Sequence, residues 1–342
     1  MKLANKKILA ILLAVFMLIS LAACGGTAPN KEKGNEKSAV NDSAEKPDKS
    51  SDSGKGLDKI AFIVADMANE SQAFSSRMFQ KYGKDYNFEV IILDAKGDVQ
   101  AETQAVNNAV AQGVKALFVN PNDINAIVPA LEAAKSAGVV VGLYSSDLPA
   151  DKQSARDFFV GVNDNQAGEA AAQAFMDFFP DGATIVEIGG QSGHDAQIKR
   201  HDGFNNAIKD SKIQVIDYKA TQQWSTEQAM AIMEDMITKH GDKIQGVFVH
   251  WDNGATGVIQ AAKAANMEGL FIVGVDGNRA GFEQVRQGDQ SVTIMQNFEN
   301  MTKKSLELAR KVIDGEKVEP LNFIPLDIVN IDNIDSFTPP EW

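Results

Sequence analysis

The sequence contains a single cysteine, Cys24, in 342 residues, and it has too few basic residues to balance its acidic ones. One cysteine cannot form an internal disulfide or supply a thiolate metal cluster, which excludes disulfide scaffolds and zinc ribbons. Lys and Arg number 33 against 46 Asp and Glu, for a formal net charge of −13. Because nucleic-acid binding needs a basic patch that displaces counterions, this charge predicts no nucleic-acid partner.

Several motifs of catalytic and cofactor sites are also missing. There is no Gly-x-Ser-x-Gly nucleophile elbow, no Gly-x-Gly-x-x-Gly dinucleotide fingerprint and no phosphate loop. The four histidines have no common metal-ligand spacing: His194, His201, His240 and His250. The sequence therefore predicts no metal and no cofactor.

The first 24 residues have the layout of a secretory signal. Three lysines precede an apolar run over 8–21, which is too short to span a membrane. The string Leu21-Ala22-Ala23-Cys24-Gly25 resembles the bacterial lipobox, which implies cleavage after residue 23 and a lipid on Cys24. We predict a signal peptide at 1–23 and an extracytoplasmic protein that a lipid anchor at Cys24 attaches to the cell membrane.

The composition changes abruptly after Cys24. From 25 to 56 the chain contains Lys, Glu, Asp, Ser, Asn and Gly, with Val40 as the one larger apolar residue. Such a stretch cannot bury enough surface to offset its ordering entropy. We interpret 24–57 as the lipidated cysteine followed by a disordered tether.

From Lys59 onward, short apolar strands alternate with amphipathic helices. The predicted strands are 60–65, 88–93, 116–119, 139–144, 159–162, 184–188, 213–218, 246–249, 271–275 and 291–295. The helical segments between them include 102–112, 124–137, 166–179, 197–209, 226–239, 255–265 and 301–314. Continuous apolar strands that alternate with helices indicate parallel sheets covered on both faces, so the fold class is α/β.

The pattern repeats within the chain. Residues 115–123 align with 245–253, and 141–144 align with 273–276, so a strand and the polar residues after it recur in the same order. We predict two similar Rossmann-like lobes. Ligands in open α/β sheets bind beyond the carboxyl ends of the strands, so two such lobes form a cleft lined by strand-end residues.

Those strand ends are rich in amides, carboxylates and aromatic rings. Two of the three tryptophans, Trp224 and Trp251, lie there. Carboxylates accept O–H hydrogen bonds, amides donate and accept, and an indole covers the C–H face of a ring. This combination favours an uncharged ligand with many hydroxyl groups.

The chain from about 58 to 327 resembles the type I periplasmic sugar-binding proteins, closest in layout to the ribose-binding solute receptors of ABC importers. The resemblance rests on six segments and one residue: 60–65 with Asn69, 116–121, 163–165, 200–204, 273–277 and 292–296. It implies two lobes joined by a hinge of several crossovers, a first lobe of 58–163 plus 297–325 and a second of 164–296 plus 326–342. It also implies ligand positions at Asn69, Trp224, Asp276 and Gln296.

With the other strand-end residues, the predicted ligand-binding set is Asn69, Gln72, Ser145, His194, Arg200, Trp224, Trp251, Asp252, Asp276 and Gln296. The chain departs from the ribose-type pattern at several of these. Ser145-Ser146 replaces an Asp-Arg pair, Ile198 replaces a first arginine, and Trp251 stands where the family usually has Asn. Phe74 is expected to compensate for a missing stacking aromatic, and His194 and Arg200 to supply donors. Altered specificity follows, because arginine forks fix hydroxyls strongly.

Three functions remain open on the sequence. The first is a monomeric solute-binding lipoprotein that captures a carbohydrate or polyol and delivers it to an ABC permease by hinge closure. The second is a sensor that presents a sugar or an autoinducer-like molecule to a membrane kinase or chemoreceptor. The third is a glycosidase with Asp252 and Asp276 as paired carboxylates, against which the strand-end repeat argues, so we predict that the chain is not an enzyme.

Overall fold

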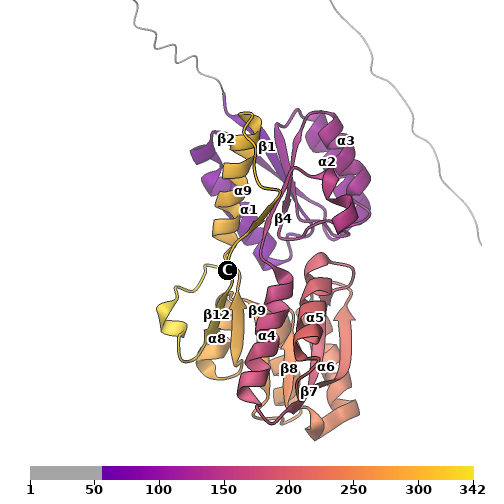
Figure 1. The fold of residues 1–342 in the computed structure, drawn as a ribbon, viewed down its shortest axis with the longest axis vertical. Helices are drawn as coiled ribbons and strands as arrows, with labels where there is room; N and C mark the ends of the chain where they lie inside the picture. Colours follow the sequence, from indigo (N-terminus) through magenta and orange to yellow (C-terminus); the bar gives the residue numbers. More distant parts are fainter. Residues whose placement is uncertain (1–55) are drawn as a thin grey trace, which may run out of the picture. The chain divides into compact units, whose positions relative to one another are not determined.

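The computed structural model describes residues 56–342. The predicted signal peptide, Cys24 and nearly all of the predicted tether lie outside these residues. Two lobes, each a six-stranded sheet with helices on both faces, make up the described chain (Figure 1). The predicted α/β class with two similar lobes is confirmed.

The sheet of the first lobe is parallel throughout. Its strands, from edge to edge, are β11 (Leu321–Phe323), β5 (Phe158–Gly161), β4 (Val140–Tyr144), β3 (Ala116–Val119), β1 (Asp58–Val64) and β2 (Phe88–Asp94). Its helices are α1 (Glu70–Tyr82), α2 (Val99–Ala111), α3 (Val128–Ser136) and α9 (Phe298–Ile313).

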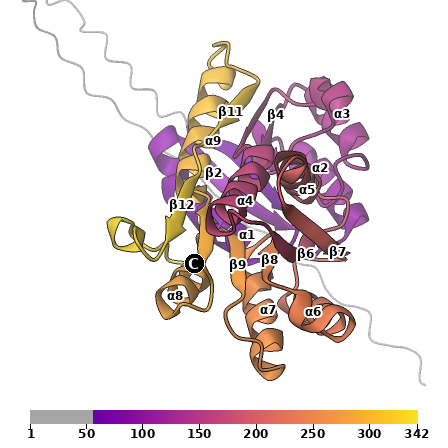
Figure 2. The same cartoon turned by 60° about the horizontal axis from the view of Figure 1, so that its bottom comes forward.

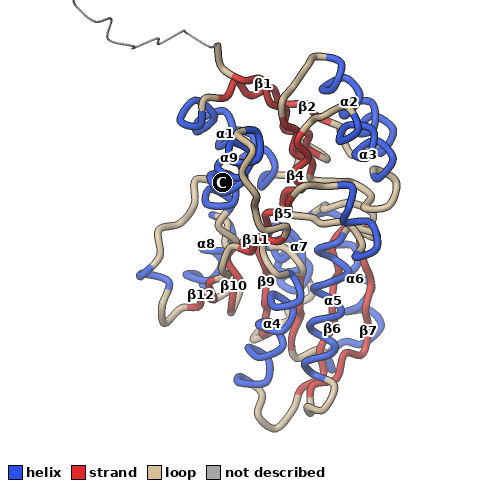
Figure 3. The backbone as a smooth tube through the Cα atoms, turned by 45° about the horizontal axis from the view of Figure 1, so that its top comes forward, coloured by secondary structure: helices blue, strands red, loops and turns tan. Residues whose placement is uncertain are grey.

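Alternation along β1 explains how both faces of this sheet are covered. Phe62 is buried with residues of α1 and α9, whereas Ile63 is buried with residues of α2 and α3. Successive side chains of a strand point to opposite faces. The first lobe therefore has two apolar cores, and helices lie on both sides of its sheet (Figure 3).

The second sheet has the same order with one strand reversed. Its strands are β12 (Asp327–Asn330), β10 (Val292–Met295), β9 (Phe271–Asp276), β8 (Gly246–Val249), β6 (Ala183–Gln191) and β7 (Ile213–Thr221), and only β12 is antiparallel to its neighbour. Its helices are α4 (Asp164–Phe178), α5 (Asp195–Ile208), α6 (Thr226–His240), α7 (Asp252–Ala264) and α8 (Arg279–Gln287). The predicted repeat is confirmed, because β3 and β4 occupy the same places in the first sheet as β8 and β9 in the second.

The chain crosses between the lobes three times: between β5 and α4, between β10 and α9, and between β11 and β12. Figure 2 shows the late α9 and β11 in the first lobe, where α9 lies against β4 and β5 and β11 pairs with β5. One residue departs from the expected division: Trp342 packs into the core of the first lobe, although 326–342 were assigned to the second. None of the helices within 56–342 is long and apolar enough to cross a membrane.

Helices α4 and α5 approach each other closely because glycines face the partner backbone. A Cβ on Gly168 would lie 2.2 Å from the carbonyl oxygen of Arg200, and a Cβ on Gly203 would lie 2.2 Å from that of Asn165. This contact holds the start of α4 against Arg200.

We expect Gly168→Ala to lower the free energy of unfolding by about 1–3 kcal/mol, because the added methyl has no room. Glu169→Ala, at the exposed neighbouring position, is the matched control. Urea denaturation of both variants measures the difference. An equal loss in the two would show that the close approach contributes nothing.

Glu102 is a buried carboxyl group in the first lobe. It accepts hydrogen bonds from the backbone N–H of Asn122 at 3.0 and 3.2 Å. Burial raises the pKa of Glu102 to about 8, although the hydrogen bonds from Asn122 oppose this. Because the folded-state pKa lies above the ordinary value, the stabilising contribution is complete at low pH and is lost as pH rises through about 8.

We therefore expect wild-type stability to decline between pH 5 and pH 8.5 by about 1–3 kcal/mol more than that of Glu102→Gln, which cannot ionise. Denaturant midpoints across this range measure the difference. Parallel pH profiles for the two proteins would contradict the prediction.

Candidate functional site

Two neighbouring cavities, which share several lining residues, lie where the carboxyl ends of the strands in both sheets meet. The inner one, which we call the inner chamber, has a volume of about 40 Å³, and the outer cleft has about 510 Å³. The inner chamber is lined by Asn69, Ser71, Gln72, Asn120, Ser145, His194, Ala196, Arg200, Trp224, Trp251, Asp276, Gln296 and Phe298. A further hollow of about 550 Å³ at the opposite end of the second lobe is mainly apolar and lacks such convergent polar groups.

Nine of the ten residues predicted to bind ligand line this inner chamber, and the exception is Asp252. Its fully buried carboxylate accepts hydrogen bonds from Gly277 N at 2.8 Å, Thr293 Oγ1 at 2.7 Å and Gln290 Nε2 at 2.8 Å. These contacts fix Gly277, which directly follows Asp276 at the end of β9. The expectation of a ligand contact for Asp252 is corrected accordingly: its oxygens are already used inside the lobe.

The same placement weakens the glycosidase alternative. Asp276 lines the inner chamber and Asp252 does not, so the two do not face one bond from opposite sides. Within 56–342, no group of three or more His, Cys, Asp or Glu side chains is arranged to hold a metal ion.

Asp276 and Arg200 are the charged residues of the inner chamber. Asp276 Oδ1 accepts a hydrogen bond from Gln296 Nε2 at 2.8 Å. Burial raises the pKa of the Asp276 carboxyl, and the positive charge of Arg200 opposes this. The backbone φ of Asp276 is 127°, a strained value of the kind that accumulates at functional sites.

Arg200 is fixed from two sides. Its Nε donates to Asp164 Oδ1 at 2.9 Å, and its Nη1 donates to the carbonyl of His250. Asp164 begins α4 directly after the first crossover, so the position of Arg200 is tied to the junction of the lobes. Its Nη2 has no hydrogen-bond partner among the described residues.

Aromatic rings form one corner of the inner chamber. Trp224 and Trp251 meet edge to face, with centroids 5.4 Å apart and planes at 86°. The ring of His194 meets Trp224 in the same way at 5.3 Å, and the Arg200 guanidinium lies 5.8 Å from the centroid of Trp224. Perpendicular rings present two apolar walls to whatever occupies the space between them.

His194 is a neutral donor at this corner. Burial lowers the pKa of His194 to about 3, and the charge of Arg200 adds to the effect. Its Nδ1 accepts from the backbone N–H of Ala196 at 3.3 Å as the cap of α5. In the neutral ring the proton then resides on Nε2, so His194 offers one N–H without a charge.

The first lobe contributes uncharged groups. Asn69 Oδ1 caps α1 by accepting from Ser71 N at 3.0 Å, and Gln72 Oε1 accepts from Ala65 N at 2.7 Å. Their carbonyl oxygens are therefore occupied, while their amide nitrogens have no partner recorded within 56–342. Ser145 follows β4 with a left-handed φ of 65°, which turns the chain at the wall of the inner chamber.

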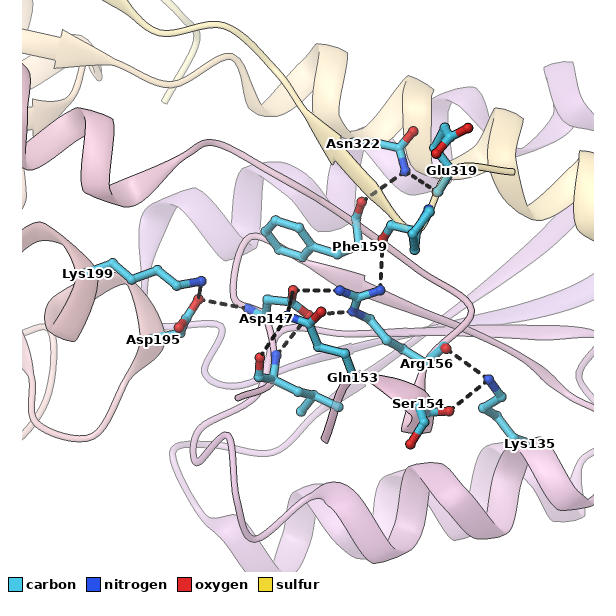
Figure 4. Close-up of polar contacts among 12 residues, drawn as sticks. Lys135, Asp147, Gln153, Ser154, Arg156, Phe159, Asp195, Lys199, Glu319 and Asn322 are labelled. Atoms are coloured by element: carbon cyan, nitrogen blue, oxygen red, sulfur yellow. Dashed lines mark hydrogen bonds and ion pairs between the residues drawn. The ribbon is translucent and has the colours of Figure 1, made fainter. Parts of the chain in front are cut away.

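Hydrogen bonds connect the lobes around the inner chamber. The backbone N–H of Asp147 donates to Asp195 Oδ2 at 3.1 Å, and Lys199 Nζ holds the same oxygen at 2.6 Å (Figure 4). The side chain of Asp147 forms a buried ion pair with Arg156. Gln191 Nε2 also donates to the carbonyl of Asn122, at 3.3 Å. The structure thus has the lobes in contact.

Four lining residues were not in the predicted set: Ser71, Asn120, Ala196 and Phe298. Asn120 directly follows β3, so its strand-end position was a signal that could have identified it. Phe298 starts α9 beyond a crossover, where no strand-end rule applies. Phe74 does not compensate for the missing aromatic as expected, because it is buried and stacks on Trp342 at 5.8 Å instead of lining the inner chamber.

Comparisons with known proteins give a consistent result. The family described as "Periplasmic binding protein domain" matches residues 60–317. The ribose import binding protein RbsB of Bacillus subtilis is 31% identical over 79% of this chain and 86% of its own length. The xylitol-binding protein of Mycolicibacterium smegmatis is 29% identical over 81% and 78%. The crystal structure of a galactofuranose binding protein superposes with a TM-score of 0.78 at 21% identity, over 82% of this chain and 96% of that one.

Proposed function

This chain belongs to the periplasmic binding protein domain family of sugar-binding solute receptors, and from that premise we propose that it captures a neutral monosaccharide or polyol between its lobes and delivers it to an ABC permease by hinge closure. In this proposal, nine of the ten residues predicted from the sequence contact the ligand. Asp252 instead supports the loop beside Asp276.

Unsatisfied hydrogen-bonding groups in the inner chamber are the main support for a ligand with hydroxyl groups. Trp251 Nε1, Gln296 Oε1 and Asn120 Oδ1 are buried without a hydrogen-bond partner among residues 56–342, and each belongs to a residue that lines the inner chamber. Buried polar groups are nearly always paired, so these three call for a bound partner. One is a donor and two are acceptors, and a hydroxyl group can serve both kinds.

The charges support an uncharged ligand. The negative charge of Asp276 and the positive charge of Arg200 offset each other within the inner chamber. The other lining residues are uncharged, and His194 is among them. An additional charge on the ligand would be buried without a counter-ion, which is costly. The relatives point the same way, since their names give ribose and xylitol as ligands, both neutral and rich in hydroxyls.

Closure follows from the division of contacts between the lobes. Asn69 and Ser145 come from the first lobe, and Trp224 and Asp276 come from the second. A ligand gains contacts to both walls only when the lobes approach, so binding shifts the population toward the closed form. The inner chamber of about 40 Å³ holds on the order of three water molecules, so a sugar has to enter while the lobes are apart.

The lipid anchor predicted at Cys24 completes the proposal by holding this receptor at the membrane that contains its permease. Radiolabelled palmitate tests it, and Cys24→Ser should release an unlabelled protein from the membrane fraction. Label retained by the variant would place the lipid elsewhere.

The binding function is tested by a thermal-shift screen of the purified protein against pentoses, hexoses, deoxy sugars, polyols, inositols and nucleosides. One class should raise the Tm with ligand concentration, following RT ln(1 + [L]/Kd). A screen in which no neutral polyhydroxyl compound raises the Tm, while amino acids or anionic metabolites do, would overturn the proposal.

A further inference from the structure

The segment 338–342 leaves the second lobe and reaches the first. Just before it, Ile334 and Phe337 pack with Phe282 and Val285 of α8 in the second lobe. Trp342, in contrast, is buried among residues of α1 and α9 in the first lobe, with an exposed fraction of 7%. Figure 1 shows this end of the described chain between the two lobes. The segment therefore adds a crossing to the three described above.

Trp342 is attached to both lobes at once. Its indole stacks on Phe74 of α1, with ring centroids 5.8 Å apart, and meets Phe298 of α9 edge to face at 5.1 Å. Its main-chain oxygen accepts a hydrogen bond at 2.6 Å from the backbone N–H of Arg279, the first residue of α8 in the second lobe. If the lobes separate here, either this hydrogen bond breaks or the indole leaves the core of the first lobe.

Two hollows border the segment. One, of about 280 Å³, is lined by residues of α1 and of the crossover between β10 and α9, and the other, of about 370 Å³, by residues of α1 and α8. Residues of both lobes line each hollow, so the lobes leave space between them at this place. Pro339 and Pro340 restrict the backbone before Trp342, which reduces the entropy lost when the indole is placed. The indole is therefore the main attachment of the segment to the first lobe.

Trp342 also lines the outer cleft, together with Asn69 of the first lobe and Asp276 of the second. It does not line the inner chamber. The residue thus lies where the two walls of the cleft move relative to each other, and it does so without contacting the place assigned to the ligand.

We infer that Trp342 is a clasp: a residue that joins the two lobes non-covalently and raises the population of the closed form. An indole that is buried only when the lobes are together stabilises that form by its burial, because the open form exposes the ring to water. The clasp acts on the closing motion of the proposed function, yet the test below needs no ligand.

The distance between the lobes measures the effect of the clasp. Spin labels at Glu132→Cys in α3 and Asp235→Cys in α6, both exposed positions, report on the two lobes by pulsed electron paramagnetic resonance. The full-length chain also carries Cys24→Ser, which removes its one natural cysteine. Without ligand, this protein should show a short-distance population. Trp342→Ala should lower the ratio of short to long distances about tenfold, within what the burial of an aromatic side chain contributes.

Two further variants separate the clasp from general damage to the fold. Phe337→Ala is the matched control, because it removes a ring from the same end of the chain but from packing inside the second lobe. It should lower the Tm and leave the distances unchanged. The double variant Pro339→Gly, Pro340→Gly keeps the indole and loosens its approach, so the ratio should fall about threefold. It tests the clasp even if Trp342→Ala does not fold.

The outcomes distinguish the clasp from the proposed function. Unchanged distances in a folded Trp342→Ala would overturn the inference, and so would the absence of a short-distance population before any substitution at Trp342. Ligand capture is tested separately by the thermal-shift screen. A screen in which no sugar binds would overturn the proposed function and leave the result on the clasp as measured.

Discussion

Replacing Asp276 with asparagine is expected to weaken ligand binding by about 1–3 kcal/mol, or about fivefold to 150-fold, because a ligand hydroxyl loses its carboxylate acceptor in a buried site. Asparagine is preferable to alanine here, since it keeps the size and shape of the native side chain at a residue whose backbone φ is 127°. It also keeps an oxygen for the hydrogen bond from Gln296 Nε2. Isothermal titration with the ligand found in the screen gives the change in Kd.

The ligand-free stability of Asp276→Asn provides the internal check. Burial raises the pKa of this carboxyl, so its ionised form is costly in the fold. We expect the Tm without ligand to stay the same or rise. Asp252→Asn should instead lower the Tm, because asparagine lacks one of the two carboxylate oxygens that accept hydrogen bonds from Gly277 N, Thr293 Oγ1 and Gln290 Nε2. An unchanged Kd in Asp276→Asn would show that the ligand does not contact this residue.

Replacing Arg156 with leucine is expected to lower the free energy of unfolding by about 3–5 kcal/mol, because it leaves a buried carboxylate without its partner. The side chains of Arg156 and Asp147 are 1% and 2% exposed, and Nη2 of the arginine donates to Oδ2 of the aspartate at 2.8 Å. Arg156 Nη1 also donates to the carbonyl of Pro320 at 2.8 Å, next to the edge strand β11. Urea denaturation measures the loss.

Asp195→Ala is the matched control for this network, because it removes the acceptor of the Asp147 N–H across the lobes and leaves the ion pair in place. It also removes the ion pair of Asp195 with Lys199, so its expected loss is about 1–2.5 kcal/mol, still below that expected for Arg156→Leu. If Arg156→Leu lowers the free energy of unfolding no more than Asp195→Ala does, the ion pair contributes no net stability to the first lobe.

The central strands were predictable because they are continuous apolar runs between polar turns. β3 and β8 were located to the residue, and their similarity predicted the repeat of the lobes. β11 and β12 gave no such pattern: they are three and four residues long, lie at sheet edges, and expose Leu321 and Ile328. A short edge strand forms through pairing with its neighbour, which a local sequence window does not contain.

The site was predictable to the level of strand ends and no further. That rule placed His194, Trp224 and Asp276 around one space, because parallel strands end at one edge of their sheet. It could not tell which end residues turn inward. Asp252 and Trp251 are adjacent, yet one supports a loop and the other lines the inner chamber. That choice depends on loop geometry set by Gly277 and Thr293, more than twenty residues away.

Because of the three crossovers, each lobe depends on segments from near the end of the chain. The first lobe draws its strands β1 to β5 from 58–161, but it needs α9 and β11 to cover one face and finish one edge. The sheet of the second lobe lacks its edge strand until β12 has been synthesised. More than 320 residues therefore have to be synthesised before either sheet has all of its strands. Neither lobe is a continuous stretch of sequence, so removing the last 30 residues takes an edge strand from the second lobe and Trp342 from the core of the first.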